Sequence, residues 1–358
     1  MTIANRMWTC CLIAVFNGGF ILDHALADEP VTLENVIAPS ENLADEPLAE
    51  FSLDRAARFL DTAALDWQKT RNCMTCHTNY LYLMARPMLG DEVPAISTVR
   101  DYAERLVSER WETKGPRWDA EVVMTAAVLA SHDAATGGTL HPLTRRALDR
   151  IWTVQKEDGG LDWLKCDWPP MESDDHFGAT ICAIGVGLAP EGYAQTPAAQ
   201  AGLAKLRDYL RANPPPTLHH RAMLLWASIY VDGIMSEDER RSCVDQMQAL
   251  QRPDGGWSLP SLGDWRRADG TPQDMATSDG YGTGFVIYIA RLAGVSADDE
   301  RLVRGIEWLK SNQRASGRWF TRSLWKDNKH FLTHAGTALA VMALASCEPP
   351  NGNETAGQ

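Results

Sequence analysis

The chain has 358 residues, a formal net charge of −13 and a hydrophobic content of 45%. This length and composition suit a globular protein with one large core or two ordinary ones. An acidic balance without any basic block argues against a nucleic-acid partner and against binding to anionic membrane surfaces.

The first 27 residues have the pattern of a secretory signal. A short basic start ends at Arg6, an apolar run covers residues 7–22, and Ala25-Leu26-Ala27 supplies a small-residue cleavage site. Polar and glycine residues at 17–19 weaken the apolar run, which favours removal over retention as a membrane helix. We therefore expect a periplasmic or secreted protein that has no stable membrane span after the signal is removed.

Three further segments follow the signal. Residues 28–51 are rich in Pro, Glu, Asp and Ala without periodicity, which is typical of a flexible leader. From residue 52 to residue 347 the pattern is helical almost throughout and no stretch alternates as a strand does, so we predict a single all-α domain. We expect residues 348–358 to form a disordered tail.

The predicted helices come in pairs, and the pairs repeat. The first helix of each pair is amphipathic with a charged face, at 53–70, 96–112, 143–156, 198–212, 237–250 and 299–312. The second is apolar or rich in small residues nearly all round, as buried helices are, at 78–89, 120–131, 177–188, 221–231, 281–292 and 333–345. Six outer helices alternating with six inner ones predict an α6/α6 toroid, a closed ring around a central cavity. An open solenoid is the alternative, but near-equal units without polar capping repeats favour closure.

Three outer-to-inner loops carry the same signature, a glutamine followed by glycine and then tryptophan. The pairs are Gln155 with Trp163, Gln251 with Trp257, and Gln313 with Trp319. Glycine can end a helix with positive φ while the indole folds back over the junction. The signature resembles the QW motif of the prenyltransferase and squalene-cyclase repeat family. That resemblance implies an α/α toroid, in agreement with the count of helices.

A Cys-x-x-Cys-His stretch, formed by Cys73, Cys76 and His77, precedes the first inner helix. This spacing attaches c-type haem, because both thiols can form thioethers with vinyl groups while the imidazole binds iron. Such attachment takes place outside the bacterial cytoplasm, where the signal would send the chain. A local disulfide and a zinc site are the alternatives. We predict haem c and a redox or electron-transfer role, with a redox partner protein or an apolar molecule as partner.

In a toroid all inner helices begin at one mouth of the ring, because each is entered from an outer-to-inner loop. The polar residues expected at this mouth are Cys73, Cys76, His77, Asp119, Glu172, Asp174, Asp175, His176, His219, His220, Asp279, His330 and His334. Asp119 is expected to cap its helix. Three carboxylates and an imidazole crowd the start of the third inner helix, where like charges should raise at least one pKa. We therefore predict catalytic roles for Glu172, Asp174, Asp175 and His176, and also for Asp279.

Residues 172–175 resemble the D-x-D-D acid motif of squalene-hopene cyclases, in which the middle aspartate protonates an alkene. The resemblance implies Asp174 as proton donor, with Glu172 and Asp175 at the flanking positions, in a terpenoid or prenyl-chain isomerase or lyase. Glu172 replaces the first aspartate of the family motif. The predicted inner helices also carry mainly Ala, Gly, Thr and Val rather than the aromatic rings that stabilise carbocations. This cyclase-like enzyme is the alternative to the haem protein.

Several ligand sets stay open. The second axial ligand of the haem is one of His176, His219, His220, His330, His334, Met84 and Met88, or none. The architecture also resembles toroid protein prenyltransferases, which implies zinc at this mouth, bound by Cys73, Cys76, His77 and Cys166 or by Asp279 with His334. His77, His220 and His334 are the predicted metal ligands. The Trp-rich loops 161–171 and 258–276 are expected to be lids or aromatic covers. A toroid that only binds a ligand is the third possibility.

Overall fold

The structure is a computed structural model of the chain that describes residues 29–39, 45–327 and 329–348. The predicted signal at 1–27 lies outside the described residues, as does the tail from residue 349. The chain divides into two compact units, Met1–Pro30 and Val31–Gln358, and everything below concerns the second. Within the described part of the chain, no helix is both long and apolar enough to cross a membrane.

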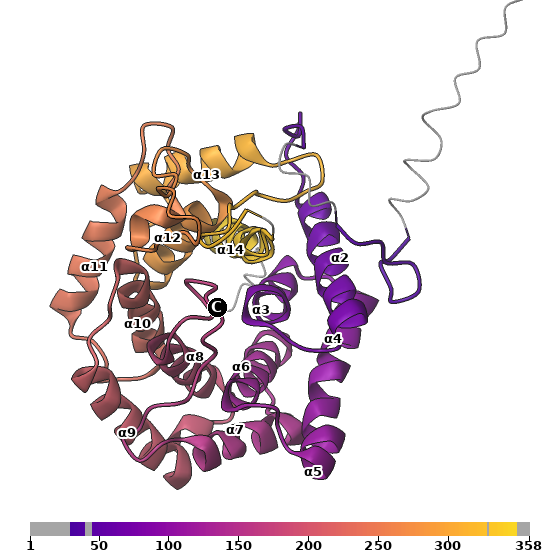
Figure 1. Cartoon of the computed structure of the whole chain (residues 1–358), viewed down its shortest axis with the longest axis vertical. Helices are drawn as coiled ribbons and strands as arrows, with labels where there is room; N and C mark the ends of the chain where they lie inside the picture. Colours follow the sequence, from indigo (N-terminus) through magenta and orange to yellow (C-terminus); the bar gives the residue numbers. More distant parts are fainter. Residues whose placement is uncertain (1–28, 40–44, 328, 349–358) are drawn as a thin grey trace, which may run out of the picture. The chain divides into compact units, whose positions relative to one another are not determined.

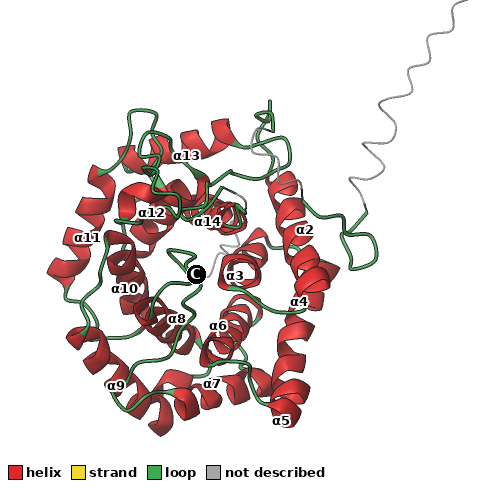
Figure 2. Cartoon of the chain, viewed as in Figure 1, coloured by secondary structure: helices red, strands yellow, loops and turns green. Residues whose placement is uncertain are grey.

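The second unit is a ring of helical hairpins, so the predicted all-α toroid is confirmed (Figures 1 and 2). The outer ring consists of α2 (Leu53–Arg71), α4 (Pro94–Arg105) continued through η3 (Leu106–Arg110) into α5 (Trp111–Lys114), α7 (Pro142–Val154), α9 (Pro197–Ala212), α11 (Glu237–Ala249) and α13 (Glu300–Asn312). The inner ring consists of η1 (Cys76–Tyr80) continued into α3 (Leu81–Ala85) and η2 (Arg86–Leu89), α6 (Asp119–Thr136), α8 (Asp175–Leu188), α10 (Leu218–Tyr230), α12 (Gly280–Leu292) and α14 (Leu332–Cys347).

The two rings differ in how much of each helix is buried. The outer helix α7 buries only Thr144, Ala147, Leu148 and Ile151, which lie on one face at helical spacing. The inner helix α14 buries almost every residue from Leu332 to Leu344. A helix that is apolar all round is stable only when other elements surround it, and this places it in the inner ring.

Gln313 closes the ring. Its side-chain Nε2 donates to the carbonyl of Gly317 at 2.9 Å and to that of Ser52 at 2.8 Å, while its Oε1 accepts from Ser52 N at 2.8 Å. These bonds join the last hairpin to the residue that caps α2 at the other end of the chain. Gln155 and Gln251 bind their own loops and the next outer helices in the same way. The prediction of a closed ring rather than an open solenoid is therefore confirmed.

The three tryptophans of the repeated signature are buried. The indole N–H groups of Trp257 and Trp319 donate to carbonyls in the preceding outer helices, at Met247 and Leu309. That of Trp163 donates instead to the carbonyl of Met171 at 2.8 Å. The third hairpin thus uses its tryptophan to hold the loop that crosses the mouth.

The described part of the predicted leader packs on the ring. Val31 and Val36 are buried, and the amide of Leu48 donates to the carbonyl of Gln313 at 2.7 Å. The carboxylate of Asp45 forms an ion pair with Arg318 at 2.9 Å. The flexibility expected for residues 28–51 stays a prediction, since packing contacts do not measure motion.

Large side chains fill the centre of the ring, so the prediction of a central cavity lined by small residues was wrong. The inner helices surround a space of about 10 Å³, room for a single water molecule, which is lined by aliphatic side chains and by Tyr80, Phe177, Trp226, Tyr281 and Phe285. The small residues instead serve the contacts between helices. A Cβ atom on Gly284 of α12 would lie 2.5 Å from the backbone nitrogen of Ala340 in α14. Because small residues face the neighbouring helices, the few large ones face the axis.

Candidate functional site

The structure brings the starts of five inner helices into contact at one rim, as predicted. Four side-chain contacts join them: Cys76 Sγ to Glu172 Oε1 at 3.1 Å, Thr78 Oγ1 to His334 Nδ1 at 3.0 Å, His220 Nε2 to Asp174 Oδ2 at 2.9 Å, and His219 Nε2 to Tyr281 Oη at 2.9 Å. These residues come from η1, from the loop and N-cap that precede α8, and from α10, α12 and α14. The polar groups that the sequence scatters over more than 250 positions therefore form one region.

The loop between α7 and α8 crosses this mouth. Met171 lines the central space, and the Trp168 ring lies 6.0 Å from that of Phe331, at the start of α14. Glu172, the next residue, reaches Cys76 in the first hairpin. The loop therefore acts as the cover that its tryptophans indicated.

Cys76 and His77 face the same carboxylate oxygen. Cys76 is 1% exposed, and its Sγ lies 3.1 Å from Glu172 Oε1, while His77 Nε2 lies 3.9 Å from that atom. Burial, together with the Glu172 charge, raises the pKa of the Cys76 thiol well above its usual value, so the thiol donates its hydrogen to the carboxylate. Burial likewise raises the pKa of Glu172.

Cys73, the other thiol of the motif, is half-buried, and burial raises its pKa too. Neither Cys73 nor Cys76 forms a disulfide in the structure. The two thiols differ in access, since Cys73 reaches solvent and Cys76 does not. Both are protonated at neutral pH, the form in which a thiol adds to a vinyl group with its hydrogen.

His77 is held on three sides. Its ring stacks on Phe331, with centroids 5.1 Å apart and planes 7° from parallel, and meets the edge of Trp67 at 4.8 Å. Its Nδ1 is hydrogen-bonded to Thr78 Oγ1 at 2.8 Å. Only Nε2 is left to bind another group, and it faces Glu172. The residue belongs to η1, a single π-helical turn of the kind that often marks functional sites.

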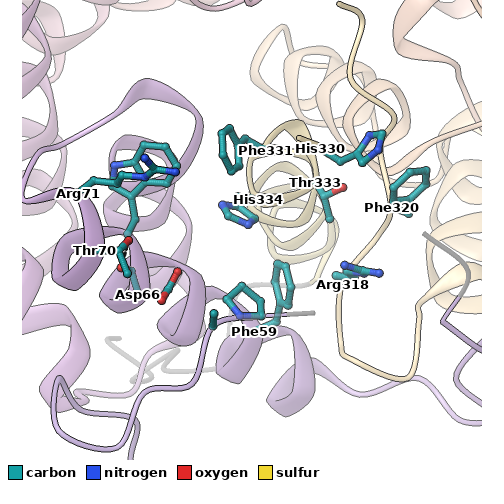
Figure 3. A pocket seen from close by; sticks show the side chains of 13 residues that line it. Phe59, Asp66, Thr70, Arg71, Arg318, Phe320, His330, Phe331, Thr333 and His334 are labelled. Atoms are coloured by element: carbon teal, nitrogen blue, oxygen red, sulfur yellow. Dashed lines mark hydrogen bonds between the residues drawn. The ribbon is translucent and has the colours of Figure 1, made fainter. Parts of the chain in front are cut away.

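A cavity of about 110 Å³ lies beside the motif (Figure 3). Figure 3 shows α2 side chains, such as Asp66 and Arg71, on one side and those of Arg318, His330 and His334 on the other. His334 lines this cavity, and burial lowers its pKa to about 4. Trp67 and Phe331 belong both to the cavity wall and to the surroundings of His77, so one aromatic layer separates the cavity from the motif.

Asp174 belongs to a second polar group. It caps α8 by accepting from Phe177 N at 3.0 Å, and its other oxygen lies 2.9 Å from His220 Nε2. His220 Nδ1 is in turn hydrogen-bonded to Thr217 at 2.7 Å. Burial alone would raise the pKa of Asp174, but the hydrogen bond and the charge of His220 bring it down to about 2. A carboxylate held ionised accepts protons, so this arrangement does not favour the proton donor that the resemblance implied.

The carboxylate of Asp175 lies in a third environment. It forms ion pairs with Lys165 at 2.9 Å and Lys156 at 3.2 Å, and accepts from the amide of Trp163 at 2.9 Å. The three carboxylates that the sequence groups together therefore do not share one site. One of the three carboxyls, Glu172, does have a raised pKa, but the cause is burial. The prediction that like charges would raise it was wrong.

His176 and Asp279 are both buried at the rim. The His176 ring meets the His220 ring edge-on at 5.6 Å, and within the described residues neither of its nitrogens has a hydrogen-bond partner. Burial, with the neighbouring His220, lowers the pKa of His176 to about 4. The oxygens of Asp279 accept from Gly282 N and Leu259 N, while burial raises its pKa to about 6. Asp279 thus caps α12 and also holds the loop at Leu259, and its catalytic role stays a prediction.

The predicted metal ligands do not converge. Over residues 29–39, 45–327 and 329–348, no three His, Cys, Asp or Glu side chains are placed to hold a metal ion. Cys166 is exposed on the covering loop, while His220 faces Asp174 and His334 is bound to Thr78. The zinc site stays a prediction.

Sequence reasoning missed the residues that orient the histidines. Thr78 and Thr217 each hold an imidazole Nδ1, and Trp67 and Phe331 pack on the ring of His77. A threonine directly after the Cys-x-x-Cys-His stretch was a usable signal. Thr217 caps the helix that carries the histidine it holds, and Trp67 lies in the outer helix of the same hairpin as His77. Phe331 comes from the last hairpin, so the fold alone brings it to His77.

Fold and rim together define an α/α toroid whose mouth carries a Cys-x-x-Cys-His motif and a hydrogen-bonded Asp–His pair. No protein-family model matches the chain. No curated protein matches it either.

Solved structures with a similar fold include two terpene cyclases and a glycosidase. The first is ent-copalyl diphosphate synthase from Streptomyces platensis, at 15% identity and a TM-score of 0.49, covering 75% of this chain and 49% of that one. The chain thus spans about half the length of that synthase. The second is the type II terpene cyclase MstE from Scytonema, at 12% identity and 0.47, covering 82% and 98%. The third is an alpha-1,6-mannanase from Salegentibacter, at 10% and 0.49, covering 82% and 99%. At these identities the likeness concerns the fold alone.

Proposed function

We propose that this chain is an exported redox protein that carries haem c at the mouth of the toroid. Cys73 and Cys76 attach the haem, and His77 Nε2 binds its iron. When bound, the haem supplies one-electron transfer. The chain exchanges electrons with a partner protein or an apolar molecule at the rim.

One observation carries the proposal, the shared direction of Cys76 Sγ and His77 Nε2. Both atoms face Glu172 Oε1, at 3.1 and 3.9 Å. A thiol and an imidazole can bind one haem together only if the sulfur and the ring nitrogen face the same side. The bond from His77 Nδ1 to Thr78 also supports the proposal, because a ligand histidine is usually oriented through its other ring nitrogen.

The donors fit the haem, but the space in front of them is filled. Glu172 occupies it, and the adjoining central space holds about 10 Å³ where ligand pockets commonly hold roughly 300–1,000 Å³. Attachment therefore requires the covering loop to swing away. Each thioether then forms when a thiol S–H adds across a vinyl group, with sulfur joining one carbon and hydrogen the other, so no oxidant is consumed.

Expression of the full chain with and without a periplasmic c-type maturation system tests this proposal. With maturation we expect a Soret band that survives denaturation, and Cys73→Ala with Cys76→Ala should abolish it. Cys243→Ala removes a buried thiol of the outer helix α11 and serves as the matched control, which keeps the band. A colourless, folded protein under maturation conditions, with both motif thiols free, contradicts the proposal.

The Asp174–His220 pair supports a second candidate, an acid–base enzyme acting on an apolar molecule such as a terpenoid. With Thr217 it forms a hydrogen-bonded relay at the rim, above a centre lined by aromatic rings. In this function Asp174 orients His220, which moves the proton. Turnover of a polyprene that His220→Gln abolishes, while Cys76→Ala leaves it intact, would favour this candidate over the haem protein.

A further inference from the structure

Thr78 lies between two histidines that come from opposite ends of the chain. Its single hydroxyl is hydrogen-bonded to His77 Nδ1 at 2.8 Å and to His334 Nδ1 at 3.0 Å. His77 and Thr78 are buried, Thr78 being 4% exposed, and His334 is partly buried. The hydroxyl therefore has these two nitrogens as its partners.

A hydroxyl has one hydrogen to donate, so it cannot treat both nitrogens alike. If it donates to one Nδ1, it accepts a hydrogen from the other. Aromatic rings pack against both imidazoles, Trp67 and Phe331 against His77 and Phe59 and Phe331 against His334. Such apolar surroundings favour the neutral imidazole, which carries one N–H. Two arrangements are then allowed, and in each the two rings carry their hydrogens on different nitrogens.

We propose that Thr78 locks His77 and His334 in opposite tautomers, so that what binds His77 Nε2 is transmitted to His334 in the neighbouring cavity. Thr78 is thus a positioning residue rather than a catalytic one. With the carboxylate of Glu172 3.9 Å from His77 Nε2, the hydrogen of His77 sits on Nε2 and that of His334 on Nδ1.

Any group that takes the lone pair of His77 Nε2 reverses this arrangement. The hydrogen of His77 then sits on Nδ1 and is donated to Thr78, whose own hydrogen goes to His334 Nδ1. His334 must then carry its hydrogen on Nε2, in a residue that lines the cavity of Figure 3. The number of hydrogens is unchanged. The link between this reversal and iron binding rests on the proposed function. The coupling between His77 and His334 does not.

The test uses the full chain made without haem and labelled with ¹⁵N in histidine. Two-bond nitrogen–proton correlations at pH 7 identify which nitrogen of each ring carries the hydrogen, and His77→Phe and His334→Phe assign the signals. We expect opposite tautomers for the two rings. Glu172→Leu, which removes the acceptor beside His77, should shift the tautomer of His334 although the two residues are not in contact.

Three variants decide whether Thr78 transmits the effect. Thr78→Ser should keep the hydroxyl and the tautomer shift, and Thr78→Val should lose the shift. Thr70→Val, at a threonine that lines the cavity, should leave the shift unchanged. Equal tautomers in the two rings, or a shift that persists in Thr78→Val, would overturn the proposal. Because no haem is present, a failure of haem attachment leaves this result unaffected.

Discussion

Glu172 and Asp174 lie two residues apart and yet occupy opposite electrostatic environments. Glu172 meets a buried thiol and the neutral imidazole of His77, and its pKa is raised. Asp174 meets a helix N-terminus and His220, and its pKa falls to about 2. The partners brought by other hairpins, rather than the local sequence, therefore decide which carboxyl is ionised.

Replacement of Asp174 by alanine should give the strongest contrast with Glu172. Asp174→Ala removes the cap of α8 and leaves His220 without its acceptor, so we expect a loss of about 3 kcal/mol in the free energy of unfolding. Glu172→Ala should lose less than about 1 kcal/mol, because a buried carboxyl with a raised pKa adds little to stability. Urea denaturation followed by circular dichroism measures both. Asp208→Ala, at an exposed surface pair, is the control and should change stability by less than about 0.5 kcal/mol.

The two carboxyls should change the stability of the protein in opposite directions as the pH changes. The pKa of Asp174 is lowered from 3.8 to about 2, so its contribution is complete above pH 3.8 and is lost as the pH falls toward 2. We expect this contribution to be on the order of 1–2 kcal/mol. Asp174→Asn should flatten the stability profile in this range. A profile that keeps the wild-type slope would show that His220 does not hold the carboxylate.

Glu172→Gln should change the profile in the opposite sense. Since the pKa of Glu172 is raised from 4.5, the wild type loses stability as the pH rises above 4.5, and the variant should not. Between pH 4 and 7 we expect the free energy of unfolding of Glu172→Gln to rise relative to that of the wild type by less than about 1 kcal/mol. Thermal denaturation at several pH values gives this difference. A variant that loses stability relative to the wild type over this range would contradict the account.

The rate of thiol labelling should show whether the loop between α7 and α8 covers the motif, and this test needs no substitution. At pH 8 we expect a maleimide to modify exposed Cys166 first and half-buried Cys73 next, while Cys76 reacts only when the protein opens. Mass spectrometry of peptides follows each site with time. Cys182, which is fully buried in α8, provides the reference for a thiol that reacts only on unfolding. Labelling of Cys76 as fast as Cys73 would mean that the loop does not cover it.

Much of the fold could be predicted because helix periodicity and the repeated Gln–Trp signature are local patterns. The alternation of amphipathic and apolar helices located all twelve ring positions, and the common entry loops predicted one rim. The centre was predicted wrongly because composition does not tell which way a side chain points. Gly284 faces α14, whereas Phe285, the next residue, faces the axis.

The sequence could predict which residues lie at the site, but not which of them contact one another. The sequence suggested that residues 172–176 act together, yet Asp175 turns to Lys156 and Lys165 while Asp174 turns to His220. A helix start rotates successive side chains by about 100°, so neighbours in sequence face different hairpins. The partner of Cys76 was also hidden, because Glu172 reaches it from 96 residues away.

The most direct test of the central claim is the intact mass of the denatured full chain after expression with the maturation system. We expect a mass higher by one haem, which His77→Ala retains in part and Cys73→Ala with Cys76→Ala loses completely. A mass equal to that of the polypeptide alone, in a folded protein made under these conditions, would contradict it.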